Sequence, residues 1–155
     1  MTSAVKINDA KWRGILARVS AMKRPTVRVG VMGDAGDEKG VSLAEIAAFH
    51  EFGTSTIPER SFLRSTFYGH GADGLAKMCA KLSKAIIEGT MDETRALGLL
   101  GLWAVSEVRK TIRARIAPEL APETIRRKTV DGKAGDVPLI DDGQLINSIT
   151  WIVEP

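Results

Sequence analysis

The sequence is poor in the residues that hold transition metals and form covalent cross-links. It contains one cysteine, Cys79, and two histidines, His50 and His70. A single cysteine cannot form a disulfide within the chain, which is typical of a protein from a reducing compartment. The segment HEFGT places Thr54 where the second zinc ligand of an H-E-x-x-H motif would stand. We therefore expect no metal site and no cofactor.

Long apolar runs are also missing. The longest uncharged apolar run, from Ala96 to Val105, covers about half of the roughly 20 residues that a membrane span needs. The opening residues, MTSAVKINDAKWRG, mix charges early and lack the apolar centre of a secretory signal. We expect no membrane association and synthesis in the cytoplasm.

No motif for catalysis is present. The chain has no G-x-S-x-G elbow, no phosphate-binding glycine loop and no dinucleotide fingerprint. Cys79 lies between Met78 and Leu82 in a helical pattern, and nothing in the sequence indicates an activated thiol. We expect no catalytic residues and no enzymatic activity. A hydrolase centred on His50 and Glu51 is the enzymatic alternative.

Charge is concentrated in one segment. The chain has a net charge of +3, yet the segment from Arg109 to Lys128 alone has a larger basic excess. Its charged residues are Arg109, Lys110, Arg113, Arg115, Arg126, Arg127 and Lys128 against Glu119 and Glu123. Such a segment can bind phosphates, or its cations can stabilise the end of a helix. No aromatic residues alternate with these charges, as they would in a surface that stacks bases.

Periodicity predicts a mixture of helices and strands. Apolar spacing predicts helices over about 9–21, 72–88 and from Thr90 onward, and a short helical piece over 122–128. Ser42 with Glu45, and Thr90 with Glu93, match the capping-box pattern. The helix after Ser42 should end near Gly53. Because the helix after Thr90 is apolar nearly all round from residue 97 to 105, we expect it at the centre of the domain.

Two segments alternate as strands do. They run from Thr26 to Met32 and from Ser148 to Val153, and we expect them to pair. Glycine-containing segments at 33–40 and 129–137 are expected to be mobile loops. The sequence therefore predicts one α+β domain over residues 1–155, with a small antiparallel sheet packed against two long helices.

The most unusual stretch is FHEFGTSTIPERSFLR, from Phe49 to Arg64. It surrounds a Gly-Thr-Ser-Thr turn and one proline with aromatic and charged residues. Arg60 and Arg64 are four apart and are expected on one helical face, with Phe62 and Leu63 turned inward. Without a catalytic pattern around it, the stretch is interpreted as a corner of the fold that also faces a partner.

This stretch resembles a signature of tailed-bacteriophage neck and tail-completion proteins, the group of minor tail protein Z-like and virion-morphogenesis families. Their E-F-G-T turn followed by I-P-x-R-P-F-L-R is similar to EFGTSTIPERSFLR here. Their second signature is similar to LAPETIRRK and PLIDDGQLINSI. Ser61 stands where the families usually have proline, and Asp142 where they usually have threonine.

The resemblance implies a set of interaction residues. They are Glu51, Phe52, Gly53, Thr54, Ile57, Pro58, Arg60, Phe62, Leu63, Arg64, Leu139, Ile140, Asp141, Gly143, Leu145 and Ser148. It also implies a structural virion protein at the head–tail junction, made in the host cytoplasm and assembled as a ring between connector and tail.

The partners that the resemblance implies are head-completion or connector proteins, tail-terminator or tail-tube proteins, and further copies of the chain in a six- or twelvefold ring. Contact with packaged DNA is compatible with this position. The alternative from the residues themselves is a nucleic-acid-binding accessory protein that uses the basic segment 109–128.

Overall fold

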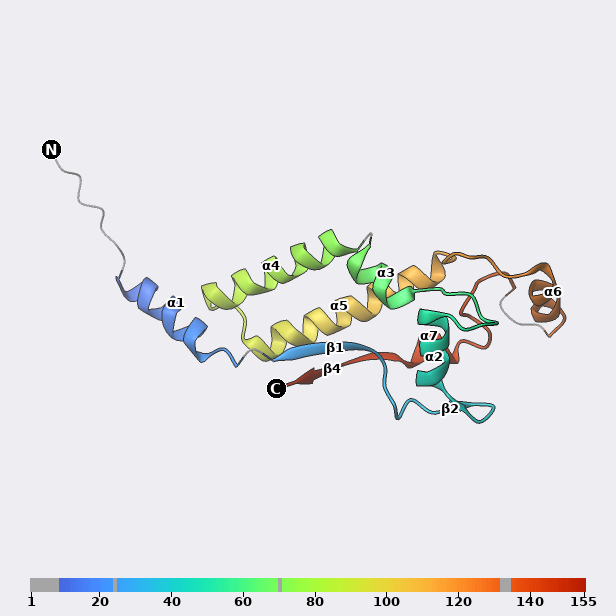
Figure 1. Ribbon diagram of the computed structural model, residues 1–155. Coiled ribbons are helices and arrows are strands. Elements are labelled where there is room, and N and C mark those ends of the chain that lie inside the picture. Colours follow the sequence, from blue (N-terminus) through green and yellow to red (C-terminus); the bar gives the residue numbers. More distant parts are fainter. Residues whose placement is uncertain (1–8, 24, 70, 132–134) are drawn as a thin grey trace.

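The computed structural model describes residues 9–23, 25–69, 71–131 and 135–155 (Figure 1). Its helices and small antiparallel sheet confirm the predicted α+β class. The elements follow in the order α1 (Asp9–Ala21), β1 (Thr26–Val31), β2 (Asp37–Glu38), β3 (Val41–Ser42), α2 (Leu43–Phe52), α3 (Phe62–Tyr68), α4 (Ala72–Glu88), α5 (Glu93–Arg113), α6 (Pro122–Val130), α7 (Gln144–Ser148) and β4 (Ile149–Glu154). No helix in these ranges is long and apolar enough to cross a membrane.

The main sheet joins two strands that lie far apart in the sequence. β1 pairs antiparallel with β4, in a register that sets Val31 opposite Ile149 and Thr26 opposite Glu154. This pairing was predicted and is confirmed. Val29 and Trp151, which face each other in the register, pack against the hydrophobic core. The period of two residues along a strand places these apolar side chains on one face.

Helix α5 is the centre of the fold, as its composition predicted. The sheet contacts α5 on one side and α4 contacts it on another, so the three form successive layers (Figure 1). The sheet packs mainly on α5, and α4 packs on α5 in turn. Val108 and Ile112 of α5 are fully buried and share the core with Phe62 of α3 and Ile149 of β4.

The starts of α2 and α5 test the two predicted capping boxes. The Ser42–Glu45 capping box at α2 is present in both directions, and Gly53 follows the helix with φ of 73°. The predicted box of Thr90 and Glu93 is wrong. Asp92 caps α5 by accepting a hydrogen bond from the Arg95 N–H, whereas the Thr90 hydroxyl donates to the Ala85 carbonyl at the end of α4. Asp92 is preferred because its charge also complements the positive end of the helix dipole.

The two predicted loops are partly structured. The segment 33–40 contains β2, which forms a small hairpin with β3. Helix α6 extends through Val130 into the predicted segment 129–137, of which residues 132–134 lie outside the described residues. A strand of two residues is too short to leave a period in the sequence, which is why the hairpin was missed.

Helix α1 forms as predicted, but its apolar stripe is left uncovered. Trp12, Leu16 and Val19 are 53%, 46% and 48% exposed. The helix contacts α4 and projects beyond the layered body (Figure 1). The Arg18 guanidinium donates two hydrogen bonds to the Ile87 carbonyl at the end of α4, at 3.0 and 2.7 Å.

Candidate functional site

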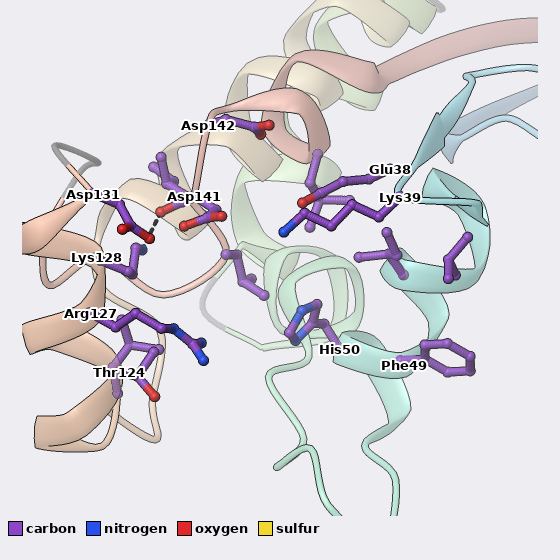
Figure 2. Close-up of a pocket in the computed structure, with 16 residues that line it drawn as sticks. Glu38, Lys39, Phe49, His50, Thr124, Arg127, Lys128, Asp131, Asp141 and Asp142 are labelled. Atoms are coloured by element: carbon purple, nitrogen blue, oxygen red, sulfur yellow. Dashed lines mark hydrogen bonds between the residues drawn. The ribbon is translucent and has the colours of Figure 1, made fainter.

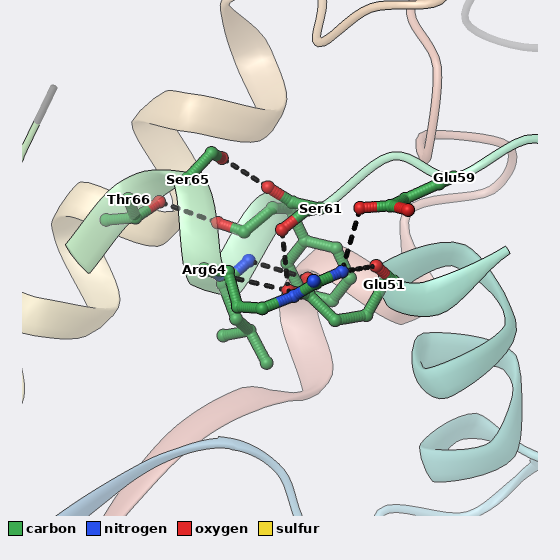
Figure 3. Close-up of polar contacts among 8 residues, drawn as sticks. Glu51, Glu59, Ser61, Arg64, Ser65 and Thr66 are labelled. Carbon is green, nitrogen blue, oxygen red and sulfur yellow. Dashed lines mark hydrogen bonds and ion pairs between the residues drawn. The ribbon is translucent and has the colours of Figure 1, made fainter. Parts of the chain in front are cut away.

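The Glu51 carboxylate is the centre of the first motif (Figure 3). The residue lies near the end of α2 and is only 3% exposed. Its oxygens accept hydrogen bonds from the backbone N–H groups of Leu63 at 2.8 Å and Arg64 at 3.0 Å. The first N–H groups of a helix have no partner within it. Glu51 therefore caps α3 from a neighbouring helix, and its negative charge favours that position.

Two side chains complete the contacts of this carboxylate. The Ser61 hydroxyl donates to it at 2.8 Å, and Arg64 Nε donates at 3.0 Å. A proline in place of Ser61 could not make this hydroxyl contact. Arg64 also pairs with Glu59 at 2.9 Å and lies over the Phe52 ring, 4.8 Å from its centroid. The hydrogen bond to Glu51 raises the pKa of Arg64, so the guanidinium stays charged.

Arg60 does not share a helical face with Arg64, which corrects the prediction. It precedes α3 and is 5% exposed, and burial lowers its pKa. Its guanidinium donates to the carbonyls of Pro118 at 2.7 Å and Glu119 at 3.1 Å. Arg60 was misplaced because the i,i+4 spacing assumes a helix that begins only at Phe62. Its contacts join the first motif to the segment that precedes α6.

The turn between α2 and α3 is held by its own polar groups. The Thr54 hydroxyl oxygen accepts from the Ile57 N–H at 2.9 Å, and the Thr54 N–H donates to the Ile57 carbonyl at 2.8 Å. Gly53 has a positive φ, and a Cβ there would lie 3.0 Å from the Glu59 backbone nitrogen. Glycine is therefore required at this corner.

The end of the second motif forms α7 and leads into the last strand. The Asp142 carboxylate accepts from the Gln144 N–H at 3.1 Å, and Gly143 takes a left-handed conformation before α7. Gly143 is the N-cap residue of α7, and Asp142 just before it satisfies the first N–H group of the helix. The Ser148 hydroxyl donates to the Leu145 carbonyl at 2.8 Å.

The two motifs meet at one end of the molecule. Leu145 of α7 shares a core cluster with Phe62 of α3, and Leu139 and Ile140 pack against it.

The predicted interaction residues fall into three groups. The buried group comprises Glu51, Arg60, Phe62 and Leu145. The half-buried group comprises Gly53, Ile57, Leu63, Leu139, Ile140, Asp141, Gly143 and Ser148. The exposed group comprises Phe52, Thr54, Pro58 and Arg64. The buried group maintains the fold, so only the other two groups can touch a partner.

Where the motifs meet, the surface is hollowed into a groove of about 660 Å³, shown in Figure 2. We call it the motif groove; α2, the β2–β3 hairpin, α6 and the segment 139–145 line it. Its apolar residues include Val41, Phe49, Leu120 and Leu139. Charged residues of both signs also line it: Glu38, Lys39, Arg127, Lys128, Asp131, Asp141 and Asp142. Phe49 was predicted as an apolar anchor, but the groove was not predicted, because four separate segments build it.

His50 lines the motif groove beside these residues (Figure 2). Burial, and then the positive charge of Arg60, lower its pKa. Its Nδ1 atom is buried and has no hydrogen-bond partner among the described residues. Both effects favour the neutral imidazole in the folded chain.

The basic segment is used largely within the chain. Arg109 donates to the carbonyls of Ile146, Asn147 and Ile149. Lys128 is 6% exposed and donates to the carbonyls of Val137 and Ile140. The other intrachain pairs of the segment are Lys110 with Glu107, Arg115 with Asp136, and Arg126 with Glu123. The sequence could not show these contacts, because most of the acceptors lie in distant segments.

Comparison with known proteins adds no relative: no family model, no curated protein and no solved structure matches the chain.

Proposed function

We propose that the chain is a structural protein of the phage head–tail junction, which assembles as a ring between connector and tail. The resemblance of the two motifs suggests this function. Its support from the structure is that the motifs, far apart in sequence, pack together in one core cluster through Phe62 and Leu145. A core cluster shared by both motifs explains why a family would keep them together.

The observation that carries the proposal is the amount of large apolar surface left uncovered. In the described ranges, Trp12 and Phe52 are 53% and 65% exposed. Leu102 on the central helix is 60% exposed. Single exposed apolar residues are ordinary, but contiguous ones, such as the stripe on α1, mark surfaces that bind other proteins. Aromatic residues are also enriched at such interfaces.

The main sheet offers a second kind of contact. Within the described residues β1 and β4 each have a single neighbouring strand, so each also has one open edge. An open edge presents unpaired backbone groups that an extended segment of another chain can satisfy. Both features suit a protein whose neighbours in the virion complete its surface. Its partners would then be connector or tail proteins and other copies of itself.

The nucleic-acid alternative has less support. Five of the seven cations in the basic segment contact groups of their own chain. Cations that bind DNA would be directed at phosphates, and their affinity would fall steeply with salt.

Light scattering of the purified chain tests the proposal, at low and high salt and with and without a connector or tail preparation. We expect a closed ring, alone or on the partner, that persists at high salt because apolar contacts hold it. A monomer that ignores these partners but binds DNA at low salt would overturn the proposal in favour of the nucleic-acid function.

A further inference from the structure

We propose that helix α1 of one copy docks in the motif groove of the next copy, so that the chains join head to tail. This inference rests on the proposed function, since it names the contact by which the copies would assemble. It is carried by two surfaces, which are complementary in character and lie at opposite ends of the same molecule.

The donor surface is the apolar stripe of α1. Trp12, Leu16 and Val19 are spaced as i, i+4 and i+7 and are all about half exposed. This spacing is the pattern by which a helix inserts its anchors into a groove. A helix of this length is marginal by itself in water, and α1 has no buried residue. A partner that covers the stripe would supply the missing stabilisation.

The helix is held with the stripe uncovered. Arg18, on another side of α1, binds the Ile87 carbonyl through two nitrogens, and its guanidinium lies within 3.2 Å of where a Cβ of Gly89 would be. These contacts fix α1 on the end of α4. The stripe is therefore presented by a defined scaffold, which lowers the entropy lost on binding.

The acceptor surface is the motif groove. Val41 and Phe49 on its wall are 38% and 41% exposed, and its volume of about 660 Å³ is large enough for an indole and a leucine side chain. Figure 2 shows His50 between α2 and the side chains of α6, and the Phe49 ring on the side of His50 that is away from α6. His50 lines the same wall.

Charge favours the same pairing. The residues that line the groove include four carboxylates, Glu38, Asp131, Asp141 and Asp142, against three cations, of which Lys128 is withdrawn onto backbone carbonyls. Helix α1 has the opposite balance: Lys11 and Arg13 stand against Asp9, while Arg18 is held on the Ile87 carbonyl. Complementary charge of this kind selects the partner and orients it.

The arrangement of the two surfaces makes the contact intermolecular. Figure 1 shows α1 beyond one end of the layered body, and α2, α6 and α7 at the other end. The stripe cannot reach the groove of its own chain while α1 is docked on α4. A contact between two different surfaces is heterologous, and it produces a ring when the rotation between successive copies closes.

The test uses two variants that each lose one surface. The donor variant carries Trp12→Ala and Leu16→Ala; the acceptor variant carries Val41→Arg and Phe49→Ala. All four positions are exposed, so both variants should keep the wild-type circular dichroism and melting temperature. A matched control carries Tyr68→Ala and Val130→Ala, which are 86% and 81% exposed and lie outside both surfaces. Sedimentation measures association for each protein, with and without the connector preparation.

We expect the wild type and the control to assemble, and each variant alone to lose association by roughly tenfold or more, as truncation of central anchors does. A mixture of the two variants should form 1:1 dimers that do not grow, because one intact stripe then meets one intact groove. Assembly of the acceptor variant alone would overturn the inference, since α1 would then bind elsewhere.

The test also separates this inference from the proposed function. Rings formed by the donor variant would overturn the docking of α1 and leave the proposed function standing. A wild type that stays monomeric even with the connector would overturn both.

Discussion

The indole ring of Trp151 occupies the space beside Gly101 that a side chain would need. A Cβ built on Gly101 would lie 2.3 Å from Cδ2 of Trp151, closer than any real contact. Gly101 is itself buried in the centre of α5. The absence of a side chain at this position allows the sheet and the central helix to approach each other closely, because Trp151 belongs to β4 and Gly101 to α5.

Substitution Gly101→Ala should therefore destabilise the fold. Overpacking a core by one methyl group typically costs about 1–3 kcal/mol, and here it outweighs the gain of up to about 1 kcal/mol that alanine brings to a helix. Urea unfolding measures the difference. Gly98→Ala is the control, since its Cβ would lie 3.6 Å from Trp151, an ordinary contact. Equal stability of the two variants would contradict the packing described.

Removal of the Glu51 carboxylate should destabilise the fold more than the loss of an ordinary surface carboxylate. Glu51→Ala leaves the Leu63 and Arg64 N–H groups without their acceptor, so we expect a loss of about 2–4 kcal/mol in the free energy of unfolding. Glu59→Ala, which breaks an exposed pair with the same Arg64, should cost less than about 1 kcal/mol. Similar losses at both positions would show that Glu51 is not the cap of α3.

The pH dependence of stability should contain a contribution from His50. Its pKa is lowered from 6.5 in the folded chain, mainly by burial and then by Arg60. The unfolded chain consequently binds more protons below about pH 6.5. The contribution of His50 to the stability of the fold is fully present above about pH 6.5, and it is lost as the pH falls toward the pKa of His50 in the folded chain.

Substitution His50→Gln should thus make stability decline less between about pH 7 and pH 5. Chemical unfolding at a series of pH values measures this. Parallel declines for the variant and the wild type would rule out the histidine as the source.

The start of α5 offers a test of the corrected cap. Asp92→Ala removes the acceptor of the Arg95 N–H and should cost about 1 kcal/mol. Thr90→Val removes only an exposed hydroxyl contact to Ala85 and should cost less. Thermal unfolding compares them, and the reverse order would restore Thr90 as the capping residue.

The sequence predicted those features whose causes are local. Ser42 and Glu45 are three residues apart, and the side chain of each bonds the backbone N–H of the other. The sequence pattern alone is therefore sufficient to predict this helix cap. The same holds for the apolar period of α4 and for the alternation in β4. Even the error at Thr90 was local, because two residues with capping side chains stand close together before α5.

The candidate site depends on contacts between distant segments and was therefore less predictable. Glu51 and Arg60 look like surface residues in a polar turn, yet each is buried by partners that the sequence does not reveal. Phe49 was recognised as an apolar anchor, but the groove around it also needs α6 and the β2–β3 hairpin. The exposed stripe of α1 is the opposite case: its apolar period predicts a buried face, but the described part of the chain does not cover it.

The pairing of β1 with β4 also affects the order of events during synthesis. Within the described structure, β1 finds its only partner strand in residues 149–154, so it emerges from the ribosome long before it can pair. Helices α4 and α5 are neighbours in sequence and can associate early, whereas contacts between distant segments form slowly. The face of α5 that receives Trp151 then stays uncovered until translation reaches β4, and an incomplete chain of this kind is prone to aggregate or to bind chaperones.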